Sequence, residues 1–396
     1  MTPRRGISLL GAAVLLSALG DFLAVIPLAL RLQHDSGSGL VVAGLFIALW
    51  TPVAVLAAPA GVLVDRFDPR RTLVAVSLAQ AVVAGGLAFA TDSTVAILAL
   101  VALLGCGAAV AGPAEFALVP AVAGGDDAEL KRANGRIESA RYLGYTLGPL
   151  LGGAVAAGGG TRIALLADAA SFVVVAGAGA ILPARPRPAR APGEDFGRAR
   201  DGIVFLMRDR VLALVISVAF VSLLFMTASA AAEVFFATDV LRAGDLGYGA
   251  LMTAWMAGMV LGATTLPRRV PATAAATTAL VAIAVQGAGL AVPTLWLALG
   301  LALVAYVVGG AAQGLKNVLV RTLIHERVPE RLHGRAYAAY NGLRNGAELV
   351  ALAGGGLLVS AVGARTTLLL AGALPVLAAL AGLAARRVPR PAPATT

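Results

Sequence analysis

Charge is scarce in this sequence, and so are cysteine and aromatic residues. Only 13% of its residues are charged, compared with about 25% in soluble globular proteins, while 59% are hydrophobic. So few charges cannot cover the surface of a water-soluble globule, and this composition is typical of a chain that lies in lipid. The single cysteine, Cys106, cannot form an internal disulfide bond.

Several kinds of functional site are missing as well. No Walker A pattern occurs, which excludes a self-contained ATP-driven pump, and no nucleophile–base arrangement predicts an enzyme. The three histidines lack the spacing of zinc ligands, so we expect neither a metal site nor a cofactor. The net charge of +10 comes from basic residues in short gaps between apolar runs, without a basic face or an aromatic platform, and we expect no nucleic-acid partner.

Long apolar runs fill the sequence instead. Each run is long enough to cross about 30 Å of hydrocarbon as a helix, and charged or Pro/Gly-rich gaps separate one run from the next. We therefore predict an all-α membrane protein with twelve transmembrane helices, at 7–30, 40–63, 72–91, 94–119, 136–158, 163–182, 211–237, 246–266, 272–291, 295–320, 337–361 and 366–385.

Part of the chain repeats itself 203 residues later. Apolar matches carry little information in such a composition, but three arginine matches do: Arg132 with Arg335, Arg141 with Arg344, and Arg162 with Arg365. The repeat pairs the fifth and sixth predicted spans with the eleventh and twelfth. It predicts two pseudo-symmetric six-helix bundles around a central site, which is the architecture of secondary transporters.

The expected domains follow from this repeat. Residues 1–182 would form the N-terminal bundle, 183–210 a linker with an amphipathic helix along the membrane surface, and 211–396 the C-terminal bundle with a short tail. Most Lys and Arg residues lie at the two termini, in the linker and in the loops on that side. The positive-inside rule then places both termini in the cytoplasm of a cell-membrane protein, and we expect a monomer.

Two short segments carry a family resemblance. The loop GVLVDRFDPRR resembles the signature loop of the major facilitator superfamily, in which the matching residues are Gly61, Asp65, Arg66, Arg70 and Arg71. Here Asp68 replaces the usual second glycine and Pro69 the usual arginine. The fifth span resembles the antiporter motif of the superfamily's drug exporters, through Gly144, Gly148, Pro149, Gly152 and Gly153.

Longer stretches at 130–153, 239–252 and 328–346 resemble the branch that contains enterobactin and macrolide efflux proteins. The resemblance covers essentially the whole chain and implies the major facilitator fold and an export function. One departure concerns the fourth span, where many proton-coupled exporters carry an arginine. The corresponding run Leu100–Ala109 has none, and this weakens the prediction of proton antiport more than that of export.

Each motif has a functional and a structural interpretation. Asp65 is placed to cap the eleventh span near Tyr337 and so to act as a gate, whereas the arginines of its loop could serve only to orient the chain. The glycines of the fifth span give it a smooth face for close helix approach, and Pro149 invites a kink. Ordinary helix packing explains the same glycines, because the spacing recurs elsewhere in the chain.

Ionisable residues inside spans are costly and are therefore candidates for transport or coupling. Asp21 is the leading proton or cation-substrate site, with a hydrogen-bonded helix contact as the rival role. Glu138 and Arg141 can share a helix face, as can Arg344 and Glu348, and these pairs either join the bundles as a charge network or neutralise themselves. The remaining candidates are Glu115, Glu233 and Lys316, whereas we assign Asp168 to helix packing or to a polar contact in the outer half of the membrane.

Taken together, these features predict a secondary transporter, a proton-coupled exporter of small amphipathic compounds such as a drug, siderophore or metabolite. Substrate would bind between the bundles, which would open in turn to either side of the membrane. An importer or lipid-translocating facilitator of the same fold and a non-transporting sensor are the alternatives.

Overall fold

Helices account for nearly all of the chain that the structure, a computed structural model, describes, namely residues 3–123, 127–182, 206–328 and 333–387. The first six helices are α1 (Pro3–Ser36), α2 (Gly39–Arg66), α3 (Pro69–Leu87), α4 (Thr94–Ala123), α5 (Asp127–Ala157) and α6 (Thr161–Ile181). The others are α8 (Arg210–Phe235), α9 (Gly244–Thr265), α10 (Ala275–Leu295), α11 (Leu299–Arg327) and α12 (His333–Arg387). Short turns η1 (Phe236–Val240), η2 (Pro267–Arg269) and η3 (Ala272–Ala274) join some of them.

The twelve predicted spans correspond to these helices. α12 holds two of them, because its backbone breaks at Gly363, where φ is 79° and ψ is 163°, a conformation that favours glycine. By length and composition alone, nine helices in the described part of the chain could cross a membrane. The second half of α12, together with α3 and α5, completes the twelve; α5 falls short on that measure because its first half is rich in charged residues.

Several predicted boundaries are wrong by a few residues. The third span was expected to reach residue 91, but α3 ends at Leu87, and the tenth was expected from residue 295, but α11 begins at Leu299. The apolar turn residues Phe89 and Trp296 extend the hydrophobic runs without continuing the helices. Hydropathy therefore overestimates helix length where a turn carries apolar side chains.

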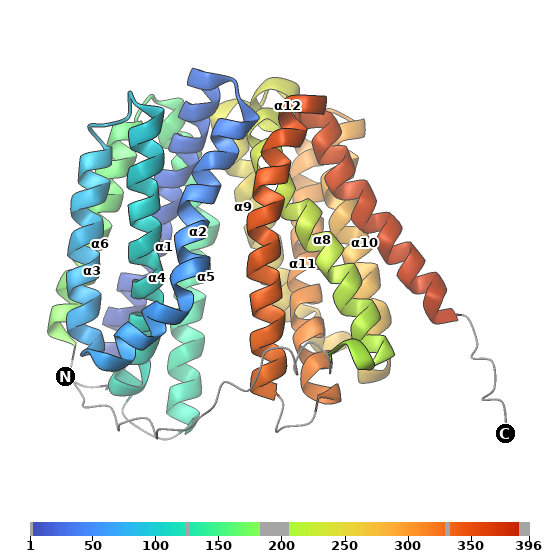
Figure 1. The fold of residues 1–396 in the computed structure, drawn as a ribbon, viewed down its shortest axis with the longest axis horizontal. Coiled ribbons are helices and arrows are strands. Elements are labelled where there is room, and N and C mark those ends of the chain that lie inside the picture. The colour runs from blue at the N-terminus through green and yellow to red at the C-terminus, as the bar shows by residue number, and fades with distance from the viewer. Residues whose placement is uncertain (1–2, 124–126, 183–205, 329–332, 388–396) are drawn as a thin grey trace.

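The two halves of the chain have the same helix order. α4, shifted by 203 residues, covers 297–326, and α11 spans Leu299–Arg327. The other helices correspond in the same way, and the contacts correspond too: α1 packs on α5 as α8 packs on α12, and α2 packs on α4 as α9 packs on α11. The result is two six-helix bundles side by side (Figure 1).

One repeated arginine pair has a structural role in both bundles. The Arg162 guanidinium lies 4.0 Å from the centroid of the Phe89 ring, just beyond the end of α3. Its counterpart Arg365 donates from Nε to the carbonyl oxygen of Thr294 at 2.8 Å, near the end of α10. α3 and α10 are themselves repeat counterparts, so each arginine covers the end of the equivalent helix.

The bundles have two ends, which we name by their loops. The basic end carries the connections after α2 and α9, with Arg70, Arg71, Arg268 and Arg269, and lies at the bottom of Figure 1. The far end carries the connections after α1, α3, α5, α10 and η1. At the basic end Asp209 caps α8 through the amides of Val211 and Leu212 and binds Arg327 at 3.0 Å. Partial burial works against its charge, but these bonds outweigh it and hold the pKa of Asp209 below the ordinary value.

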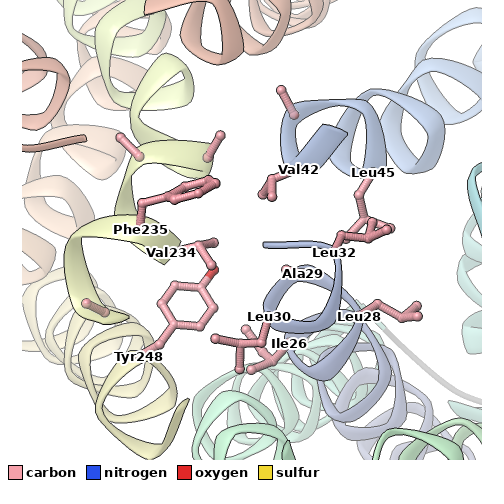
Figure 2. Close-up of a cluster of buried hydrophobic side chains, with 14 of the residues drawn as sticks. Ile26, Leu28, Ala29, Leu30, Leu32, Val42, Leu45, Val234, Phe235 and Tyr248 are labelled. Carbon is pink, nitrogen blue, oxygen red and sulfur yellow. The ribbon is translucent and has the colours of Figure 1, made fainter. Parts of the chain in front are cut away.

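Three hydrophobic cores show where the bundles meet. One core draws on both bundles at the far end, with Phe235 and Tyr248 facing Val42 and Leu30 (Figure 2). The other two lie toward the basic end, and each draws on one bundle alone. In the described part of the chain, the bundles are therefore joined at the far end and separate toward the basic end.

The seam at the far end consists of two helix pairs that are repeat counterparts, α5 with α9 and α2 with the first half of α12. Polar contacts close its rim. Gln33 Nε2 donates to Asp239 Oδ1 at 3.0 Å, and His34 Nε2 lies 3.5 Å from Asp245 Oδ1. Sequence reasoning did not single out these four residues.

The linker prediction falls largely outside the described residues. The amphipathic helix was expected at Glu194–Arg210, and of this segment the structure describes only residues 206–210. The division into domains at 182 and 211 thus remains a prediction.

Candidate functional site

A partly buried arginine forms the centre of the charged groups in the first bundle. Arg141 on α5 contacts Glu115 on α4, with 3.1 Å between Nη2 and Oε2, and Glu138 on its own helix, with 3.4 Å between Nε and Oε1. The Glu115 side chain is 8% exposed, whereas that of Glu138 is 55% exposed. Glu115 is therefore the buried counter-charge that makes Arg141 tolerable inside the bundle.

Asp21 lies next to this cluster, halfway along α1. It is within electrostatic range of Glu115 and Arg141. Its neighbours Gly20 and Ala18 are buried against the bundle, but Asp21 itself is exposed. Asp21 thus combines an exposed carboxylate, halfway along its helix, with a positive charge nearby.

Two residues join this group that sequence reasoning had not placed there. Asp168 on α6 is 2% exposed and lies against α1, where a Cβ on Gly20 would be 2.6 Å from its Oδ1. Tyr145 follows Arg141 by one helical turn, and its ring packs edge-on against Phe22 of α1 with 5.4 Å between centroids. The spacing of four residues between Tyr145 and Arg141 could have indicated that they share a helix face. Nothing in the sequence relates Asp168 to Asp21.

The charged groups of the second bundle are mostly cationic. Arg344 pairs with Glu348 on its own helix, with 2.9 Å between Nε and Oε1. Lys316 on α11 is only 5% exposed and lies in a pocket that Arg344 also lines. The other residues around this pocket come from α8 and α11: Ile216, Ala219, Phe220, Leu223, Gln313 and Asn317.

The two Glu/Arg pairs do not meet in this conformation. Arg141 is held inside the first bundle and Arg344 inside the second, so each pair neutralises its own arginine. The repeat preserves the arginines but not their surroundings, because Glu115 corresponds to Val318 and Lys316 to Pro113. As a consequence, carboxylates predominate around the first arginine and cations around the second.

Glu233 lies apart from both groups. It is on the far-end half of α8, where Ser229 Oγ donates to its Oε1 at 2.6 Å. The buried tyrosines Tyr248 and Tyr306 are within electrostatic range of it. Glu233 thus belongs to the polar part of the far-end core, close to the seam between the bundles.

The signature loop is bound to its own bundle. Arg70 donates to the carbonyl oxygen of Ala180 at the end of α6, and Arg71 Nε lies 4.0 Å from Asp68 Oδ2. Arg66 is exposed at the end of α2, and Gly61 faces open space. The side chains of Asp65 and Tyr337, on which the capping prediction depends, lie outside the described residues.

The glycine segment of α5 contacts two different helices. Cβ atoms on Gly144, Gly148 and Gly152 would lie within 3 Å of α1 atoms, so these residues permit the close approach of α5 to α1. Gly153 faces α9 in the other bundle, where a Cβ would lie 2.7 Å from the Asp245 carbonyl oxygen and 3.0 Å from Gly249 Cα. On the other side of the same contact, Gly249 approaches the carbonyl oxygen of Pro149. The segment therefore packs the first bundle and also forms part of the seam.

Comparisons with known proteins agree with this architecture. The model of the Major Facilitator Superfamily matches residues 10–351. A multidrug efflux pump named Tap from Mycobacterium tuberculosis is 30% identical over 95% of this chain and 92% of its own length. An uncharacterised MFS-type transporter from Bacillus subtilis, YfiS, is 25% identical over 97% of this chain and 94% of its own.

Solved structures show the same fold at much lower identity. The nucleoside transporter NupG superimposes with a TM-score of 0.75 at 15% identity, covering 97% of this chain and 100% of NupG. A bacterial homologue of the iron transporter ferroportin, in an inward-facing state, superimposes with a TM-score of 0.73 at 16% identity, covering 98% and 100%. At such identities the likeness concerns the arrangement of helices.

Proposed function

This chain belongs to the major facilitator superfamily of membrane transporters, and from that premise we propose that it is a proton-coupled exporter of small amphipathic compounds. The 30% identity to a multidrug efflux pump along nearly the whole chain supports export. The observation that carries the proposal is Asp21, an exposed carboxylate at mid-membrane depth beside the buried Arg141–Glu115 pair.

In the proposed cycle, the far end and the basic end of the bundles close in turn. With both termini in the cytoplasm, the conformation described here is open inward, because its seam lies at the far end. Residues 1–182 and 211–396 would rock as two bodies joined by the linker 183–210. Substrate from the cytoplasm or the inner leaflet enters between them, the far-end seam opens, and the basic end closes behind the substrate.

Asp21 would exchange the proton. When the pathway faces outward, the carboxylate takes up a proton, and when it faces inward it releases that proton to the cytoplasm. Arg141 offers a counter-charge to the carboxylate that has lost its proton, and Tyr145 and Asp168 complete its polar surroundings. Protonation of Asp21 then favours return to the inward-facing state, whereas bound substrate favours the outward-facing state. Antiport requires that the two ligands favour opposite states in this way.

Reconstituted protein tests this function directly. Proteoliposomes with an imposed pH gradient should accumulate a fluorescent amphipathic substrate against its gradient, and an uncoupler should stop the flux. Asp21→Asn should abolish gradient-driven flux while insertion and yield stay normal. Asp35→Asn, an exposed carboxylate on the same helix that pairs with Arg31, is the matched control and should retain flux.

Each result has a definite meaning. Full pH-driven flux with Asp21→Asn would show that another group exchanges the proton. Flux that ignores the pH gradient in the unaltered protein would refute proton coupling and leave transport itself intact. Absence of flux with every compound would favour a sensor.

Import is the second candidate function, because the fourth span lacks the arginine that many proton-coupled exporters carry. Substrate accumulation in whole cells distinguishes export from import, because an exporter lowers the accumulation of its substrate and an importer raises it.

A further inference from the structure

Lys316 is a buried residue without a counter-charge in the part of the chain that the structure describes. It is 5% exposed, and within the described ranges no carboxylate lies within 4 Å of its ammonium group. The nearest charged neighbour that acts on it is another cation, Arg344, whose own partner is Glu348. A buried charge is normally paired, because removing it from water is costly. The missing partner therefore calls for an anion from outside the chain.

The pocket around Lys316 is rich in hydrogen-bond donors. Gln313 Oε1 already accepts a bond from Trp255 Nε1, so the group that Gln313 has left to offer is its amide N–H. Arg344 uses Nε for Glu348 and retains its other N–H groups. Lysine, arginine and amide donors around one pocket are the set that binds a carboxylate, phosphate or sulfonate.

The opposite wall of the pocket is apolar. α8 contributes Ile216, Ala219, Phe220 and Leu223, while the polar residues come from α11 and α12. α8 and α12 are also helices through which this bundle contacts the other one. Lys316 lies about 16 Å along α11 from its end at Arg327, at 1.5 Å per residue. The pocket is thus deep in the membrane and at the side of the bundle that borders the pathway.

We propose that the Lys316–Arg344 pocket binds the acidic group of an amphipathic organic anion, and that such anions are substrates of this transporter. This inference rests on the proposed export function and specifies its substrate class. The anion supplies the charge that Lys316 lacks, and its apolar body packs against Phe220 and the neighbouring α8 side chains. Proton exchange at Asp21 takes place in the other bundle and does not compete for the same donors.

A matched pair of probes tests the proposal. 8-Anilinonaphthalene-1-sulfonate and N-phenyl-1-naphthylamine share an aromatic skeleton and differ by one sulfonate. Their binding to full-length protein in nanodiscs of zwitterionic lipid is measured by equilibrium dialysis, corrected with empty nanodiscs. We expect the protein to bind the sulfonate at least about tenfold more tightly than the uncharged probe, as a charge-assisted hydrogen bond would give.

Three variants then locate the preference. Lys316→Gln should lose about tenfold in sulfonate affinity, with little change for the uncharged probe, and Lys316→Arg should retain the preference. Arg321→Gln removes an exposed cation from the same helix and should behave as the unaltered protein. Unchanged sulfonate binding by Lys316→Gln, or an equal loss for both probes, would overturn the proposal.

A lipid headgroup could supply the same anionic chemistry, so a second arm adds phosphatidylglycerol to the nanodiscs. Loss of the sulfonate preference in that lipid would identify a headgroup as the occupant and refute a transported anion. Failure of this inference also differs from failure of the proposed function. Efflux of the uncharged probe without any sulfonate preference would refute the inference alone. Sulfonate binding without flux of any compound would refute export, and with it transport of the anion, while the anion-binding site would stand.

Discussion

At the scale of residues, the repeat matches Arg141 with Arg344, but the charged residues around these two arginines differ. Arg141 is partly buried against Glu115, a contact between residues 26 positions apart on neighbouring helices. Arg344 has its carboxylate on its own helix and shares its pocket with Lys316. A pseudo-symmetric scaffold thus carries an acidic group in one half and a cationic group in the other, and these are the groups at the proposed proton site and the proposed anion site.

The Arg141–Glu115 pair offers a stability prediction. Glu115→Gln leaves the partly buried guanidinium with only the exposed Glu138 in contact, and we expect the variant to lose at most about 3 kcal/mol of stability, the lower end of the cost of removing one partner from a buried pair. The double variant Glu115→Gln/Arg141→Gln should recover most of the loss, because no charge is left unpaired. Thermal unfolding of the purified protein in detergent measures both.

The exposed Glu326 on α11 provides the control for this cycle. Glu326→Gln should change stability by no more than about 0.5 kcal/mol, as is usual for a surface site. If the Glu115 single variant were as stable as this control, Arg141 would not depend on Glu115.

At the scale of elements, α5 is the helix with two partners. Its Gly144, Gly148 and Gly152 let it lie against α1, while Gly153 lies against α9 of the other bundle. Small residues allow the backbones to approach closely, and close approach without interlocking side chains lets one helix part from another at little cost. The glycine segment accordingly serves the permanent packing of a bundle and the reversible contact of the seam.

Gly153→Ala should open the far end. The added methyl group meets the backbone of α9, and an overpacking cost of about 1 kcal/mol would shift the population of open seams about fivefold. The measurement is the labelling rate of a cysteine placed at Val42, which is 0% exposed within the far-end core, by an impermeant maleimide. The background carries Cys106→Ala.

Gly135→Ala is the matched change on the same helix, because a Cβ at Gly135 meets nothing within 4 Å. Its labelling rate should equal that of the parent. Equal rates for Gly153→Ala and Gly135→Ala would mean that Gly153 does not hold the seam closed.

At the scale of the whole molecule, the two bundles are joined through one end. The far-end core and the contacts of Gln33 with Asp239 and His34 with Asp245 close that end, while two separate cores toward the basic end keep the bundles independent. A transporter that alternates must break this seam in every cycle. Opening of this seam is therefore a required step of the proposed transport cycle.

Cross-linking the seam should stop transport. In a Cys106→Ala background, Gln33→Cys with Asp239→Cys places two thiols where a hydrogen bond of 3.0 Å now joins the bundles. A short, cleavable thiol cross-linker should abolish efflux, and cleavage should restore it. Arg31→Cys with Asp92→Cys replaces a contact of 2.9 Å within the first bundle and should cross-link without loss of efflux. Efflux that persists after complete cross-linking at 33 and 239 would contradict alternation at this seam.

Some of the site follows from local spacing, and some does not. Glu138 with Arg141, and Arg344 with Glu348, lie three and four residues apart, and the structure has both as ion pairs. Glu115 and Asp168 could not be related to Arg141 and Asp21 in this way, because these pairs lie on different helices. Likewise, its place in an apolar run predicted Asp168 as a packing residue. Only its close approach to Gly20 in the structure shows that it lies beside α1.

The sequence by itself determined the twelve helices, the two-fold repeat and the family, because the length of apolar runs, the placement of charges and short motifs are properties of neighbouring residues. The tertiary structure decided which charges share a site, which end of the bundles is closed, and that Lys316 has no ion-pair partner among the residues it describes. Those properties depend on the register of helices that are distant in the sequence, and in a chain rich in Ala, Gly and Leu many registers satisfy the same hydrophobic pattern. Close packing of the small residues selects one of them.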